Sequence, residues 1–120
     1  MENKKLSRME YGVTQLGETE PPFSHPGFPS EAGTFLCICC SSELFSSSEK
    51  FESGSGWPSF SSPISKEAVT SKIDLSHGMR RTEVSCSNCK AHLGHVFEDG
   101  PAPTGLRYCI NGVALKFKAT

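Results

Sequence analysis

The run Arg107-Tyr108-Cys109-Ile110-Asn111, near the C-terminus, is the stretch around which the rest of the chain is organised. It is typical of a β-strand, in which successive side chains alternate between two faces. Arg107, Cys109 and Asn111 are therefore expected on one face, with Tyr108 and Ile110 on the other. A guanidinium and a carboxamide beside a thiol favour the thiolate, which is the nucleophilic form of cysteine. We therefore predict that Cys109 is the reactive centre.

Four of the other cysteines form two Cys-x-x-Cys pairs, Cys37 with Cys40 and Cys86 with Cys89. A gap of two residues lets both sulfurs of a pair reach one ion at about 2.3 Å. We predict one structural Zn²⁺ site, because four thiolates leave no coordination position open for catalysis. Two reduced redox pairs and an iron centre are the alternatives.

Cys39 remains after this assignment. Cysteine often serves as a small packing residue, so a packing role is favoured over a redox role for this side chain.

The composition predicts one mostly β domain with a modest core. The chain has 120 residues, of which 36% are hydrophobic, and glycine, proline and serine are plentiful. A structural metal ion would add stability that the small core of such a chain does not supply. No segment shows sustained helical periodicity. Residues 1–10 are expected to be a helical or disordered lead-in. A single domain is expected over 11–120, and it begins with an irregular strap, Tyr11–Phe23. Strands are expected near residues 34–36, 68–75, 79–85, 92–97, 107–111 and 113–117.

Charge and hydropathy exclude several partners. A net charge of −1 offers no field that would attract nucleic acid or an anionic membrane. The polar start lacks the apolar segment of a signal peptide, and no run of about 20 apolar residues is present. We therefore expect a monomer in the reducing cytoplasm, or in an organelle, with no nucleic-acid or membrane partner.

Three further residues are candidates for a pocket. His92 and His95 would face opposite sides of a regular strand, unless Gly94 kinks the backbone and brings them together. Beside a nucleophilic cysteine, either histidine could supply a proton. Trp57, the only tryptophan, follows two nearby glycines and is either a core residue or a platform for an apolar substrate group.

Several motifs occur in the order typical of one enzyme family. They are Gly54-Ser55-Gly56-Trp57-Pro58-Ser59-Phe60, Arg81-Thr82-Glu83-Val84, His92-Leu93-Gly94-His95-Val96-Phe97, Asp99-Gly100-Pro101 and Arg107-Tyr108-Cys109-Ile110-Asn111. Through them the chain resembles the B-type methionine sulfoxide reductases from about residue 11 to residue 117. The resemblance implies two small antiparallel sheets in a β-tent-like arrangement with the zinc at the edge. It also implies catalysis by Cys109, a pocket lined by His92, His95 and Asn111, a substrate methyl group on Trp57, and support from Arg107.

The activity implied is repair of oxidised methionine: reduction of methionine-R-sulfoxide, protein-bound or free, with a sulfenic acid formed on Cys109. A thioredoxin-type or other thiol would then regenerate Cys109. Ser55 stands where many relatives of this family carry a resolving cysteine. Direct reduction by the thiol is therefore favoured, with Cys39 as a surrogate resolving thiol, or Ser55 as an engineered replacement, as alternatives. The rival hypothesis is a zinc-stapled, non-catalytic domain that binds a small ligand or peptide in an aromatic pocket.

Overall fold

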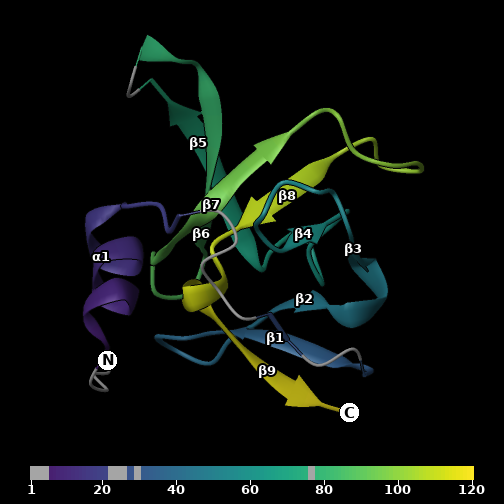
Figure 1. The fold of residues 1–120 in the computed structure, drawn as a ribbon, viewed down its shortest axis with the longest axis horizontal. Helices are drawn as coiled ribbons and strands as arrows, with labels where there is room; N and C mark the ends of the chain where they lie inside the picture. The colour runs from purple at the N-terminus through teal and green to yellow at the C-terminus, as the bar shows by residue number, and fades with distance from the viewer. Residues whose placement is uncertain (1–5, 22–26, 29–30, 76–77) are drawn as a thin grey trace.

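Two antiparallel sheets form the framework of the computed structural model, which describes residues 6–21, 27–28, 31–75 and 78–120. One sheet has the strand order β2-β1-β9 and the other β3-β4-β8-β7-β6-β5 (Figure 1). The mostly β class and the two sheets are as predicted. In chain order the elements are α1 (Arg8–Leu16), β1 (Gly33–Cys37), β2 (Glu43–Ser46), η1 (Ser47–Glu49), β3 (Lys50–Phe51), β4 (Ser59–Phe60), β5 (Val69–Asp74), β6 (Arg81–Cys86), β7 (His92–Phe97), β8 (Arg107–Ile110), η3 (Gly112–Ala114) and β9 (Leu115–Ala119).

Aromatic side chains from both sheets form the core between them. Phe35 of β1 and Phe45 of β2 are almost fully buried, and so is Phe60 of β4. The ring of Phe60 stacks on Phe45 at a centroid distance of 4.4 Å and meets Phe35 edge-on at 5.1 Å. Buried aromatic pairs of this kind add stabilisation beyond their area, so this cluster holds the two sheets together.

The helix α1 differs from the sequence-based expectation. The strap was expected to be irregular from Tyr11 onward, but the chain is helical to Leu16. Ser7 and Glu10 form a capping box, in which each side chain accepts a hydrogen bond from the other's backbone N–H. Gly17 ends the helix at φ 74°. The two caps fix the ends of this helix. Its buried residues form only one short run, Gly12, Val13 and Thr14, so the sequence shows little helical periodicity. The division into a lead-in and one domain remains a prediction.

The end of the chain also differs in detail. Residues 112–114 form the 3₁₀ turn η3 instead of the start of a strand, and β9 begins at Leu115. Asn111 lies just outside β8 and precedes η3. Part of the expected strap and of the loop that follows it, residues 22–26 and 29–30, lies outside the described residues.

Candidate active site and metal centre

The four paired cysteines meet at one point. The sulfurs of Cys37, Cys40, Cys86 and Cys89 all lie within 4.8 Å of one another. The Sγ–Sγ distance is 3.6 Å between Cys37 and Cys89 and 3.7 Å between Cys40 and Cys86. A tetrahedron with metal–sulfur bonds of about 2.3 Å has edges of about 3.8 Å, so the cluster fits one tetrahedral ion.

Two matching turns build this cluster. In each turn the carbonyl oxygen of the first cysteine accepts a bond from the N–H four residues later, Ser41 or Lys90, at 2.8 Å. These two residues have φ values of 66° and 69°, which non-glycine residues seldom adopt. The pKa of Cys86 is lowered to about 5, mainly by its hydrogen bond with Cys37. The pKa of Cys37 is raised, mainly by the same hydrogen bond, and burial raises that of Cys89 to about 11, so only part of the cluster favours thiolate, the form that binds metal.

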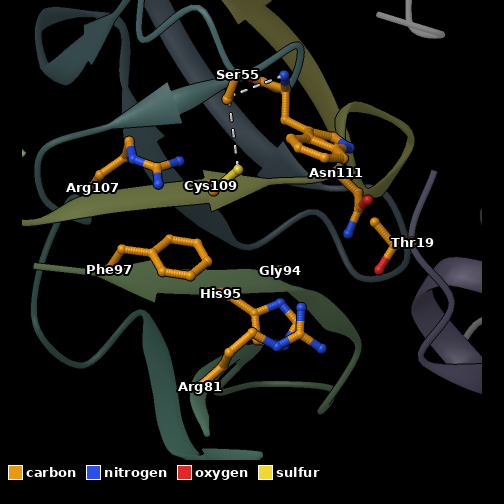
Figure 2. Close-up of a pocket in the computed structure, with 10 residues that line it drawn as sticks. Thr19, Ser55, Arg81, Gly94, His95, Phe97, Arg107, Cys109 and Asn111 are labelled. Atoms are coloured by element: carbon orange, nitrogen blue, oxygen red, sulfur yellow. Dashed lines mark hydrogen bonds between the residues drawn. The ribbon is translucent and has the colours of Figure 1, made fainter. Parts of the chain in front are cut away.

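A separate cavity of about 330 Å³ surrounds Cys109 (Figure 2). Cys109 in β8 lies directly opposite His95 of β7 on one side and Ser59 of β4 on the other. Directly opposed residues share a face of the sheet, so the histidine and the thiol face the same space. The described residues that line the cavity are Thr19, Ser55, Trp57, Arg81, Gly94, His95, Phe97, Arg107, Cys109 and Asn111.

A β-bulge places the two histidines together. Val84 pairs with Gly94 but Ser85 pairs with His92, so β7 contains one extra residue, Leu93. An extra residue reverses the alternation of faces, and the two histidine rings lie 5.6 Å apart. The sequence argument anticipated a distortion at Gly94, where a side-chain Cβ would clash with the carbonyl oxygen of Cys109. The bulge at Leu93 puts both histidines on one face of the sheet. The lack of a side chain at Gly94 lets β8 approach β7 closely.

Each histidine has an acidic partner. His92 Nδ1 lies 2.7 Å from Glu83, and His95 Nε2 lies 2.8 Å from Asp74. Burial lowers the pKa of His95, although the bond to Asp74 opposes this. His92 does not line the cavity, and its Nε2 has no hydrogen-bond partner among the described residues. His95 is therefore the histidine that the structure brings to the pocket itself.

Glu20, in the strap, connects the other two predicted pocket residues. The indole N–H of Trp57 donates to the Glu20 carbonyl at 2.9 Å, and the Glu20 N–H donates to Asn111 Oδ1 at 2.9 Å. The Glu20 carboxylate accepts the N–H groups of Gly112 and Val113 at 2.9 and 3.0 Å. Glu20 is 1% exposed, so these bonds are formed away from water.

The surroundings of the Cys109 thiol are only partly as predicted. Burial raises its pKa, and this effect outweighs the hydrogen bond from Ser55 and the positive charge of Arg107, both of which lower it. Arg107 forms two bonds with Asp99, at 2.9 and 3.2 Å, and its guanidinium lies over the Phe97 ring. The amide of Asn111 points elsewhere, because its Nδ2 donates to the Leu93 carbonyl at 2.9 Å. The expectation that Arg107 and Asn111 favour the Cys109 thiolate therefore holds for Arg107 only, and burial outweighs its effect.

Sequence reasoning missed several residues of this region. Glu20 and Thr19 lie in the expected strap, where no periodicity marks a buried side chain. Arg81 was noticed only as part of a motif, yet it lines the cavity and contacts Asp74 at 3.4 Å. In residues 53–59 the single tryptophan and its two nearby glycines draw attention to Trp57, whereas nothing in the sequence marks the hydroxyl groups of Ser53 and Ser59.

The fold and these two sites define a mostly β domain with a pocket cysteine and a separate four-cysteine cluster that could hold a metal ion. The SelR domain model matches residues 6–119. The chain is 56% identical over 117 residues to the peptide methionine sulfoxide reductase MsrB of Thioalkalivibrio sulfidiphilus, covering 97% of this chain and 85% of that protein. Proteins of the same name from Hahella chejuensis and Acinetobacter baylyi are 51% and 53% identical over 95% and 96% of the chain, and 83% and 84% of those proteins. The chain therefore belongs to the SelR domain family, and the resemblance found in its motifs is confirmed.

Among the described residues, no helix has the length and apolar character needed to cross a membrane.

Proposed function

We propose that this protein is a peptide-methionine (R)-S-oxide reductase that repairs methionine-R-sulfoxide in oxidised proteins or as the free amino acid. Its relatives named MsrB support methionine sulfoxide reductase activity. The observation that carries the proposal is the direct pairing of Cys109 with His95 in a cavity that Trp57 also lines. A nucleophile and a proton donor lie on the same face there, as this reaction requires.

In the proposed reaction the Cys109 sulfur attacks the sulfoxide sulfur, and a sulfur–sulfur bond forms. His95, which burial keeps neutral near pH 7, takes the thiol proton and passes it to the sulfoxide oxygen. The oxygen is then transferred to Cys109 as the sulfur–sulfur and sulfur–oxygen bonds break. Two electrons pass from Cys109 to the substrate, which leaves as methionine, and Cys109 remains as a sulfenic acid.

The remaining pocket residues have positioning roles in this proposal. Trp57 receives the substrate methyl group, and the place left for the oxygen near His95 selects the R epimer. Arg107 holds positive charge close to Cys109, because Asp99 and Phe97 fix its guanidinium. Asn111 ties β8 to the bulge of β7 through the Leu93 carbonyl. His92, with Glu83 on its Nδ1, lies outside the cavity lining with its ring 5.6 Å from that of His95, so its proposed role is to support His95.

The four-cysteine centre would hold Zn²⁺ in a structural role. Cys37, Cys40, Cys86 and Cys89 are all absent from the lining of the cavity around Cys109. When bound there, the ion supplies a cross-link between β1 and the β6–β7 turn and no redox chemistry.

Regeneration needs an external thiol in this proposal. Two thiol groups reduce the sulfenic acid to the Cys109 thiol, forming one disulfide and one water. A thioredoxin-type protein fits this requirement, and the enzyme would act as a monomer in the cytoplasm. Cys39 is a weaker candidate for a resolving thiol, because it lies between two ligands of the metal centre and contacts Gln15 at 3.5 Å.

The test is turnover of the separate R and S epimers of a methionine sulfoxide peptide with dithiothreitol. We expect activity on the R epimer alone, loss of that activity in Cys109→Ser, and normal activity in the matched variant Cys39→Ser. If a folded, metal-loaded sample turns over neither epimer, the non-catalytic binding domain becomes the better explanation. Lower turnover of Cys39→Ser with thioredoxin, but not with dithiothreitol, would restore Cys39 as the resolving thiol.

A further inference from the structure

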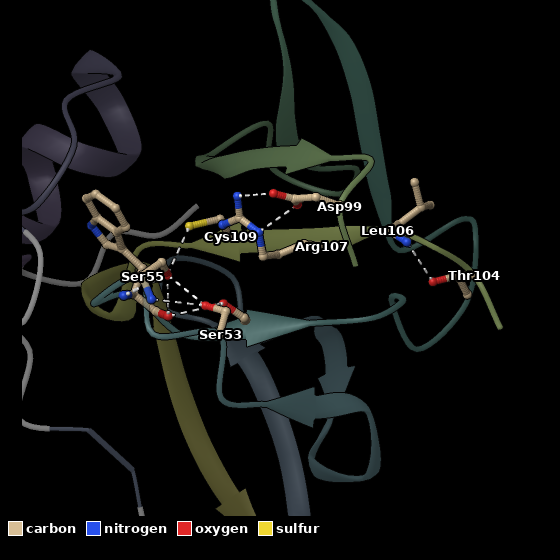
Figure 3. Close-up of polar contacts among 9 residues, drawn as sticks. Ser53, Ser55, Asp99, Thr104, Leu106, Arg107 and Cys109 are labelled. Carbon is tan, nitrogen blue, oxygen red and sulfur yellow. Dashed lines mark hydrogen bonds and ion pairs between the residues drawn. The ribbon is translucent and has the colours of Figure 1, made fainter. Parts of the chain in front are cut away.

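Three serine hydroxyls form a continuous hydrogen-bonded path to the Cys109 sulfur. Figure 3 shows its part from Ser53 through Ser55 to Cys109. Ser59 Oγ lies 2.7 Å from Ser53 Oγ, and Ser53 Oγ lies 2.9 Å from Ser55 Oγ. Ser55 Oγ is 3.9 Å from Cys109 Sγ. Ser59 is 1% exposed and is also the direct cross-strand neighbour of Cys109, so the path begins in β4 beside Cys109 and ends on the Cys109 sulfur in β8.

The path has one direction, because each hydroxyl has a single proton and two acceptor positions. Ser55 Oγ accepts the N–H of Trp57 at 3.3 Å and the O–H of Ser53. Ser53 Oγ accepts the N–H of Ser55 at 3.2 Å, and its own proton points to Ser55. Its second acceptor position is left for Ser59, whose proton has Ser53 Oγ at 2.7 Å as its nearer acceptor and the Trp57 carbonyl at 3.3 Å as the other. With both acceptor positions of Ser55 filled, its single proton has two possible acceptors, the Trp57 carbonyl at 3.4 Å and the Cys109 sulfur at 3.9 Å. The charged thiolate is the stronger acceptor of the two.

We propose that Ser59, Ser53 and Ser55 form a one-way chain of hydroxyl donors that ends on the Cys109 sulfur and stabilises its thiolate. Ser55 touches the reacting atom and is a catalytic residue of this site, whereas Ser53 and Ser59 act through it as positioning residues. The proposal deepens the function proposed above. Each donor in such a chain polarises the next, so the last hydroxyl is a stronger donor than an isolated serine.

The other groups around the thiol explain why such a donor is needed. Burial raises the pKa of Cys109, Asp99 raises it further, and Arg107 lowers it. Arg107 is shared with Asp99, which removes part of its effect on the sulfur. His95, the neighbour in β7, has a lowered pKa and so adds little positive charge. The Ser55 bond is the largest of the effects that favour the thiolate.

The test measures the thiolate without any sulfoxide, so it is independent of reductase activity. Alkylation of Cys109 by iodoacetamide is followed from about pH 6 to pH 10, around the usual thiol range. Trypsin cuts after Arg107 and Lys116, and the resulting peptide contains Cys109 as its only cysteine. We expect Ser55→Ala to lower the alkylation rate at neutral pH about tenfold, the low end for a charge-assisted bond because 3.9 Å is long.

Two further variants separate the chain from simple packing. Ser53→Ala should lower the rate about threefold, since it removes only the polarising donor, and Ser55→Thr should restore it to within about twofold. The matched control is Ser48→Ala, which breaks a similar hydroxyl pair with Ser46, at 3.0 Å, in η1. Metal content and Trp57 fluorescence establish that each variant is folded.

Equal alkylation rates in native protein and Ser55→Ala would overturn the proposal, and so would equal effects of Ser53→Ala and Ser48→Ala. If the expected rates are found but neither sulfoxide epimer is reduced, the hydroxyl chain stands and the proposed function fails. If the R epimer is reduced and the alkylation rates do not change, only the chain fails.

Discussion

The buried carboxylate of Glu20 offers a sharp test of how the strap supports the pocket, through the variant Glu20→Gln. The carboxylate accepts two backbone N–H groups, from Gly112 and Val113. Hydrogen bonds to a charged group contribute about 1.5–3 kcal/mol each. A glutamine can accept only one of the two, and its NH₂ group would face the other N–H. One buried donor then stays unsatisfied.

The expected loss is about 3 kcal/mol of unfolding free energy, from one lost charged bond, one weakened bond and one unsatisfied donor. For a domain of this size that corresponds to roughly 10 °C in thermal midpoint. The backbone of Glu20 also holds the Trp57 indole and Asn111, so we expect a red-shifted Trp57 emission and a raised KM for the sulfoxide.

Urea unfolding followed by the fluorescence of Trp57, the only tryptophan, measures the loss of stability and the emission shift in one experiment, and turnover at increasing sulfoxide concentration measures KM. The matched control is Glu18→Gln, the same chemical change at an exposed position of the same strap, which should stay within about 0.5 kcal/mol of the native protein. A Glu20→Gln variant as stable as the control, with native emission, would refute the reasoning.

Three shorter predictions concern the metal, pH and the bulge. The native chain should bind one Zn²⁺ by elemental analysis, and Cys40→Ser should lose it and melt roughly 20 °C lower; an unchanged melting point would exclude a structural metal. Because the pKa of His95 is lowered, the folded state prefers the neutral ring. This preference stabilises the fold above the ordinary pKa of 6.5, and the stabilisation is lost as the pH falls through the lower pKa of the folded state. The urea midpoint of the native protein should therefore decrease as the pH is lowered from about 7.5 to 5, and that of His95→Gln should decrease less. An equal dependence on pH in the two proteins would contradict this. Gly94→Ala should cost about 1–3 kcal/mol, because the methyl group meets the Cys109 carbonyl, and a native-like urea midpoint would show that β8 can shift.

The parts of the fold that depend on local patterns could be predicted from the sequence. The spacing of the paired cysteines led to the metal cluster, and the strand over 92–97 was placed with its observed bounds. Alternation along 107–111 correctly put Arg107, Cys109 and Asn111 beside one cavity. These features depend on the spacing of residues along the chain, which can be read directly from a single sequence.

The parts that depend on tertiary contacts could not be predicted. The pKa of Cys109 is set first by burial, which no local pattern reveals. The bulge that brings His92 toward His95 is defined by pairing with β6, and the sequence offered only Gly94 as a hint. Glu20 appeared to be one polar residue in an irregular strap, because its partners are 91 to 93 positions away.

That separation has a consequence for how the protein is made. A ribosome synthesises Glu20 early and Gly112 late, so the strap emerges long before the groups that its carboxylate accepts. Until almost the whole sequence has been translated, a growing chain therefore holds a hydrated Glu20 without its backbone partners and an unfinished pocket. Chains arrested at increasing lengths should stay sensitive to protease, and their Cys109 unprotected, until residues 111–119 are free to pack. Protection of shorter chains would show that the two sheets assemble without this closure.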